Sequence, residues 1–149
     1  MYKHILVTLD GTSDGEAVLP HALAVARAME ASLTLLRVVE PPHAEWSERG
    51  ALGKTQAESI ATTRLVDQAE AYLEKIVSEA RRMGVDAHTL VRQGPAARQI
   101  VAVARELDAD AIAMSTHSRR GFNRLMFGSV AEAVLHETSI PVVLVRSRK

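Results

Sequence analysis

The residues best suited to chemistry lie in a loop at residues 115–128, between an apolar run and a helical pattern. The loop is rich in small, hydroxyl and cationic residues, among them Arg119, Arg120 and Arg124, and it contains no acid. A strand that leads into such a loop, followed by a helix N-terminus, can hold an anion, because backbone N–H groups and the positive end of the helix dipole point at the same place. The sequence therefore predicts an anion-binding loop that the other elements must position.

The composition favours one α/β domain and excludes several classes of protein. With 149 residues, 47% of them apolar, the chain can build one sizeable core, and we expect a single domain over residues 1–149. The 18 basic and 18 acidic residues cancel, so no global field attracts nucleic acid or a membrane. The absence of cysteine excludes disulfides and thiol chemistry. No signal peptide or membrane-spanning run is recognisable, so we expect a cytoplasmic protein.

Apolar runs and helical periodicities alternate along the chain. Strands are predicted at residues 5–9, 32–39, 85–91, 109–115 and 141–145, and helices after residue 13, at 55–82, at 95–107 and from 129. This alternation predicts a three-layer α/β fold of Rossmann-like or flavodoxin-like type, an open, twisted, parallel five-stranded sheet in the strand order 3-2-1-4-5 with helices on both faces. A ligand then binds beyond the carboxyl ends of the strands where the winding reverses, between Asp10 and Ser115.

Local signals predict how the helices begin. Ser13 and Glu16 have the spacing of a capping box, as have Ser129 and Glu132 before the last helix. Pro20 falls inside the first predicted helix and should kink it, because it removes one backbone hydrogen bond. Pro95 is expected at the first position of its helix.

Several motifs together resemble one known family, the universal stress proteins. They are Lys3-His4-Ile5-Leu6-Val7-Thr8-Leu9-Asp10, Leu35-Leu36-Arg37-Val38-Val39, Gly94-Pro95 through Ile100, Gly128-Ser129-Val130-Ala131-Glu132, and Ile140-Pro141-Val142-Val143-Leu144-Val145-Arg146. The ATP-binding branch of that family has a glycine, a second glycine after two residues, and glycine-serine after nine more. This chain aligns there as Ser115, Ser118 and Gly128-Ser129, so both early glycines are serines. Serine adds a Cβ where glycine admits close approach, but it also brings a hydroxyl that can donate to phosphate.

The resemblance implies a nucleotide site with two ends. Adenine and ribose would meet the backbone near Val38 and the end of the first strand, at Thr8, Leu9 and Asp10. The phosphates would meet the fourth strand and its loop, at Met114, Ser115, His117, Ser118, Arg119, Arg120, Gly128, Ser129 and Val130.

Several of these residues also have a simpler structural interpretation. Asp10 is as well placed to cap the first helix as to bind ribose or, through phosphate, Mg²⁺. Ser129 suits an N-cap. His117 and the arginines can equally be solvated surface residues.

The resulting hypothesis is a protein that binds ATP, ADP or AMP, with or without Mg²⁺, and senses or regulates in a stress response. We assign no catalytic residue, and neither a Walker lysine motif nor a G-x-G-x-x-G is present. One alternative is a nucleotide-free dimeric interaction scaffold, and a weaker one is a slow Mg²⁺-dependent ATPase or self-phosphorylating protein. The resemblance also implies a homodimer through the final strand, at Pro141, Val142, Val143, Leu144 and Val145.

Overall fold

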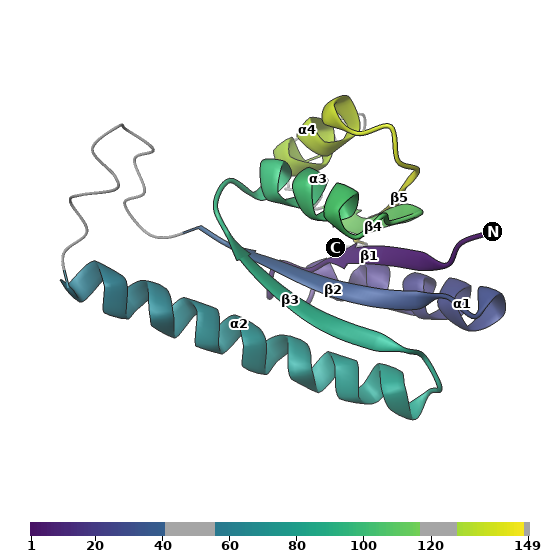
Figure 1. Ribbon diagram of the computed structural model, residues 1–149, viewed down its shortest axis with the longest axis horizontal. Helices are drawn as coiled ribbons and strands as arrows, with labels where there is room; N and C mark the ends of the chain where they lie inside the picture. The colour runs from purple at the N-terminus through teal and green to yellow at the C-terminus, as the bar shows by residue number, and fades with distance from the viewer. Residues whose placement is uncertain (41–55, 117–127, 148–149) are drawn as a thin grey trace.

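Five parallel strands form one sheet in the order β3-β2-β1-β4-β5 (Figure 1). The structure is a computed structural model that describes residues 1–40, 56–116 and 128–147. The strands are β1 (His4–Thr8), β2 (Ser32–Val39), β3 (Ala87–Gln93), β4 (Ala111–Thr116) and β5 (Val142–Arg146). The predicted fold class and strand order are confirmed, and the strand ends differ from expectation by no more than two residues.

Helices cover both faces of the sheet, which gives three layers (Figure 1). A 3₁₀ turn, η1 (Gly15–Val18), leads into α1 (Leu19–Met29), and α1 packs beside the long α2 (Gln56–Arg82) on one face. On the other face lie α3 (Ala96–Glu106) and α4 (Ser129–Glu137). Each helix returns the chain from the carboxyl edge of the sheet to its amino edge, as parallel strands require.

The central strands are buried on both sides, which explains their nearly continuous apolar sequences. Leu6 and Val7 of β1 are both 0% exposed, although they face opposite layers. Leu33 and Leu36 of β2 repeat the same arrangement. Two apolar cores therefore hold the sheet between its helices.

The first helix does not begin where the sequence suggested. Its α-helical part starts at Leu19, so Pro20 lies in the first turn, where its missing N–H costs no hydrogen bond. The expected kink at Pro20 is therefore wrong. The capping box from Ser13 is also wrong, because Asp14 is the N-cap of η1, and the Asp14 side chain makes no capping hydrogen bond.

The start of α3 is capped by a residue from another element. Pro95 is the N-cap of α3, one position before the place we expected. The Ala96 N–H donates to the Glu40 carboxylate at 3.1 Å, so the end of β2 supplies the anion that favours this helix N-terminus.

Asp110 ties the start of β1 to the start of β4. Its Oδ2 accepts hydrogen bonds from the backbone N–H groups of Lys3 (2.7 Å) and His4 (2.8 Å). These two bonds, the one from Lys3 first, lower the pKa of the Asp110 carboxyl below its ordinary value. Since they favour the ionised form, Asp110 stabilises the fold when it is charged.

We expect Asp110→Asn to lower the free energy of unfolding at pH 7, because the amide replaces an ionised acceptor. The folded pKa is lowered, so the contribution of Asp110 is complete above its unfolded pKa and is lost as the pH falls through the folded pKa. Urea denaturation at pH 7 and at several acid pH values should show the difference from wild type shrinking as the pH falls. Asp67→Asn, at an exposed position of α2, is the control. A difference that stays constant with pH would contradict this role.

Candidate functional site

The winding of the sheet reverses at β1, which lies between β2 and β4. All three strands are parallel, so their carboxyl ends lie at one edge of the sheet. Pairing of β1 ends at Thr8↔Leu36 on one side and at Val7↔Ala113 on the other, although β2 and β4 both continue. We call the carboxyl ends of β1, β2 and β4 the switch-point edge, which is where α/β sheets of this kind bind ligands.

Val38 presents backbone groups to this edge. In a parallel strand, successive residues direct their N–H and C=O groups to opposite neighbours. The Leu36 carbonyl accepts from Leu9 N–H on the β1 side, whereas the Val39 carbonyl accepts from Gly94 N–H on the β3 side. The backbone N–H and C=O groups of Val38 therefore point toward the β1 side, at a level beyond the last residue of β1. Its side chain is buried in the core beneath α3 and α4.

Asp10 organises the turn that follows β1. Its Oδ1 accepts hydrogen bonds from the Thr12 N–H (2.9 Å) and the Thr12 hydroxyl (2.6 Å). The same hydroxyl accepts from Gly15 N–H at 3.0 Å. A Cβ on Gly15 would lie 2.2 Å from Asp10 Oδ1, so only glycine lets the carboxylate pack there. Asp10 is exposed, and its hydrogen bonds hold the turn that leads into η1. The N-cap of η1 is Asp14, not Asp10.

Ser115 lies on β4 and holds η1 against the sheet. Its hydroxyl donates to the Gly15 carbonyl at 2.8 Å and accepts from Val18 N–H at 3.0 Å. The hydroxyl proton is thus directed at Gly15, and donation to a phosphate would require breaking that bond. Sequence reasoning missed this role, although strand alternation places Ser115 on the same face as Ala113, toward α1.

The N-terminus of α4 has a glycine cap. Gly128 is the N-cap and Ser129 is the first helical residue, so the expected capping box from Ser129 is wrong. Glycine has no side chain, and the first-turn amides receive no hydrogen bond from the capping residue. Ser129 and Val130 are exposed. Since α4 carries the chain back toward β5, its N-terminus faces the edge where β4 ends.

The remaining candidates differ in what they can offer a ligand. Thr8 is half-buried, whereas Leu9 and Met114 are 4% exposed and belong to the two cores, so their side chains serve packing. His117, Ser118, Arg119 and Arg120 lie outside the described residues, and their roles stay predictions.

Arg37 and Tyr72 reach the same edge, and the sequence analysis assigned them no role. Arg37 Nη1 donates to the Val38 carbonyl at 2.6 Å. The Tyr72 hydroxyl of α2 is buried without a hydrogen-bond partner. Burial raises the pKa of Tyr72 to about 12, the Glu16 and Asp10 carboxylates act in the same direction, and Arg37 opposes them. The signal for Arg37 was a charge inside an otherwise apolar strand.

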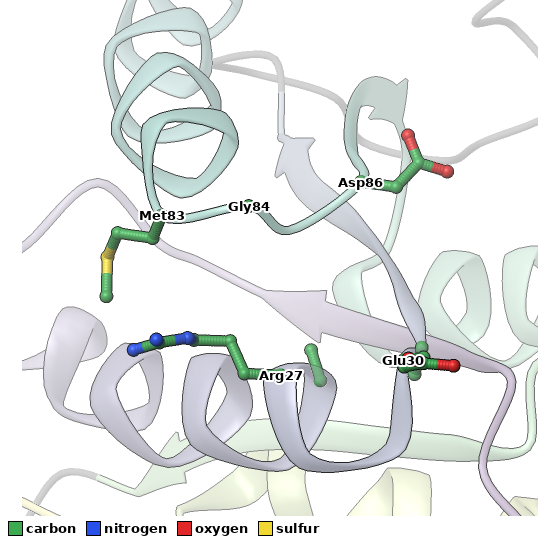
Figure 2. Close-up of a pocket in the computed structure, with 7 residues that line it drawn as sticks. Arg27, Glu30, Met83, Gly84 and Asp86 are labelled. Atoms are coloured by element: carbon green, nitrogen blue, oxygen red, sulfur yellow. The ribbon is translucent and has the colours of Figure 1, made fainter.

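A pocket lies at the opposite edge of the sheet (Figure 2). It has a volume of about 310 Å³ and is lined by Ala26, Arg27, Glu30, Ala31, Met83, Gly84 and Asp86. Arg27 and Met83 extend into the space between α1 and the end of α2, while Asp86 points away (Figure 2). These residues are at the C-terminal ends of α1 and α2, so the pocket is far from the switch-point edge and separate from the candidate site.

Residues 1–40, 56–116 and 128–147 contain no group of three or more histidine, cysteine or acidic side chains that could hold a metal ion. None of the helices in these ranges has the length and apolarity needed to cross a membrane.

Comparison with known proteins gives the family of this chain. A family model described as the universal stress protein family matches residues 1–146. The chain belongs to the universal stress protein family. Universal stress protein MJ0531 of Methanocaldococcus jannaschii is 28% identical over 156 residues, which cover 100% of this chain and 85% of the relative.

Solved structures of this family share the fold. The structure of MJ0577, also from M. jannaschii, superimposes with a TM-score of 0.82 at 26% identity and covers 100% of this chain and 98% of its own. A universal stress protein of Archaeoglobus fulgidus, solved in complex with dAMP, gives a TM-score of 0.66 at 24% identity, with 97% and 98% coverage.

We expect Ser115→Ala to lower the free energy of unfolding by about 1–3 kcal/mol, since it leaves Gly15 C=O and Val18 N–H without their partner. Ser129→Ala is the matched control, because Ser129 is exposed, and its effect should stay within about 0.5 kcal/mol. Urea denaturation measures both. Equal stability of the two variants would contradict the role of Ser115.

Proposed function

We propose that this protein binds an adenine nucleotide (ATP, ADP or AMP) at the switch-point edge and acts as a sensor or regulator in stress responses. The observation that carries the proposal is the glycine-capped N-terminus of α4 at the edge where the winding reverses. The dAMP complex of the A. fulgidus relative supports the choice of an adenine nucleotide.

The phosphates are assigned to the start of α4. The amides of Ser129 and Val130, together with the helix dipole, favour negative charge there. A Cβ added to Gly128 would meet no atom of the described residues within 4 Å, which supports the assignment of a ligand group to this position. Ser118, His117, Arg119 and Arg120 are the proposed additional donors. Ser115 contributes through its backbone, since its hydroxyl is occupied by Gly15 and Val18.

The base and ribose are assigned to the other end of the site. The Val38 backbone is proposed to meet the base, and the residues at the end of β1, Thr8, Leu9 and Asp10, to meet the ribose. The exposed Asp10 carboxylate is the candidate to meet a Mg²⁺ ion that arrives with the phosphates. Such an ion would depend mainly on phosphate oxygens, because the described residues offer no ligand cluster of their own.

We expect ATP to raise the melting temperature of the wild-type protein, since a ligand that binds only the folded state stabilises it. Gly128→Val should weaken ATP binding by about tenfold or more, because the branched side chain fills the space assigned to phosphate, a loss of about 1.4 kcal/mol or more. The fold should survive, since the φ of −57° at Gly128 suits valine. Calorimetric titration with ATP, ADP and AMP, with and without Mg²⁺, measures the affinities.

Gly128→Ala is the graded control and should weaken ATP binding less than Gly128→Val. Equal affinity of Gly128→Val and wild type would reject the assignment of phosphates to α4. If no nucleotide stabilises the wild-type protein, the scaffold hypothesis replaces this one.

We also propose that the protein forms a homodimer through β5. This strand is at the edge of the sheet and pairs only with β4. It is rich in valine, and Val143 is 43% exposed, while Val142, Leu144 and Val145 are half-buried. An apolar edge strand with unpaired backbone groups favours association with a second strand, and a second copy of this chain offers the same surface.

We expect Val143→Asp to raise the dimer dissociation constant by at least about tenfold, because an unpaired carboxylate would be buried at the interface. Ile60→Asp is the control, since Ile60 is 53% exposed but lies on α2, away from β5. Sedimentation equilibrium measures the mass of both variants. A dimer that tolerates Val143→Asp as well as Ile60→Asp would exclude β5 as the interface.

A further inference from the structure

Arg37 is the one charged residue of β2, and its guanidinium folds back onto the strand. Nη1 donates to the Val38 carbonyl at 2.6 Å, a length typical of a strong, charge-assisted hydrogen bond. The guanidinium also lies against the turn after β1, where a Cβ on Gly11 would be 3.4 Å from Nε. Gly11 has a φ of +84°, which favours glycine and keeps this approach open.

This hydrogen bond changes what the backbone of Val38 can recognise. By itself, a strand residue at the switch-point edge offers one donor, its N–H, and one acceptor, its C=O. In this protein the Val38 carbonyl already accepts a hydrogen bond from Arg37, and guanidinium has only donors, so one of the two lone pairs of this oxygen is used. The edge therefore presents donors side by side, the Val38 N–H and the remaining N–H groups of Arg37.

Purine bases differ in how well they match such an edge. Adenine carries an amino donor at C6, which needs an acceptor such as the Val38 carbonyl. A 6-oxopurine, guanine or hypoxanthine, carries O6 beside N7, and this pair of acceptors is the pattern that arginine reads in nucleic acids. The adenine amino group must share the Val38 carbonyl with the Arg37 guanidinium or displace it, whereas O6 of a 6-oxopurine accepts from Arg37 and needs neither.

The geometry points to Arg37 as a specificity-determining residue that lowers the preference of this site for adenine over 6-oxopurine nucleotides. The inference rests on the proposed nucleotide site at the switch-point edge, and it concerns how strictly that site distinguishes adenine from a 6-oxopurine.

The test compares AMP with inosine 5′-monophosphate (IMP), which differ in the amino or oxo group at C6 and in the proton that IMP carries on N1. Calorimetry gives both dissociation constants for wild type, for Arg37→Met and for the control Arg92→Met. Arg92 lies on β3 at the register of Val38, but its side chain pairs with Glu106. Arg37→Met should shift the AMP-to-IMP affinity ratio toward AMP by about three- to tenfold, the effect of one hydrogen bond regained, and Arg92→Met should leave the ratio unchanged.

A second measurement needs no variant and covers the case in which Arg37→Met does not fold. Purine riboside 5′-monophosphate lacks the amino group at C6, and it should bind wild type within about threefold of AMP, since the amino group of AMP meets a carbonyl that Arg37 already engages. A larger loss, or an unchanged AMP-to-IMP ratio in folded Arg37→Met, overturns the inference but leaves the nucleotide site standing. If the wild type binds none of these nucleotides and no ATP, the proposed function fails and this inference fails with it.

Discussion

β1 is the central strand of the sheet, and it ends before either of its neighbours does. Its last partners are Leu36 on β2 and Ala113 on β4, and both of those strands continue past this level. Backbone groups that a longer β1 would have paired must find other partners, because unpaired polar groups are costly when buried. The Val38 carbonyl, which lies beyond the end of β1, accepts its hydrogen bond from Arg37 instead. The chemistry of the switch-point edge follows from this early end.

The two ends of the candidate site are built differently. On the α1 and α2 side, hydrogen bonds join Asp10 to Thr12 and Ser115 to η1, and this network leaves few side-chain groups free. On the α4 side, the helix begins at a glycine, and its dipole is not matched by a capping side chain. A ligand placed across this edge would meet ordered side chains at its base and backbone amides at its phosphates.

Local electrostatics matter here because the chain has no net charge. At the switch-point edge, the Asp10 and Glu16 carboxylates and the Arg37 guanidinium act on one buried hydroxyl, that of Tyr72. Burial dominates, and it raises the pKa of Tyr72 to about 12, so this group stays neutral over the physiological range. Arg37 supplies the positive charge among these groups, and its guanidinium already binds a backbone carbonyl at this edge.

The amino-acid sequence by itself determined the alternation of strands and helices, because this follows from apolar runs and periodicities within short segments. That alternation favours a parallel sheet with crossover helices, which the structure has. The sequence also indicated the edge where the candidate residues meet. Only the tertiary structure decided which partners they have. The Ser115 hydroxyl forms hydrogen bonds with backbone groups 97 and 100 residues away in the sequence. The Asp110 carboxylate accepts a hydrogen bond from Lys3, which is 107 residues away. Such bonds depend on strand register and on which face each side chain takes, and packing of distant segments sets both.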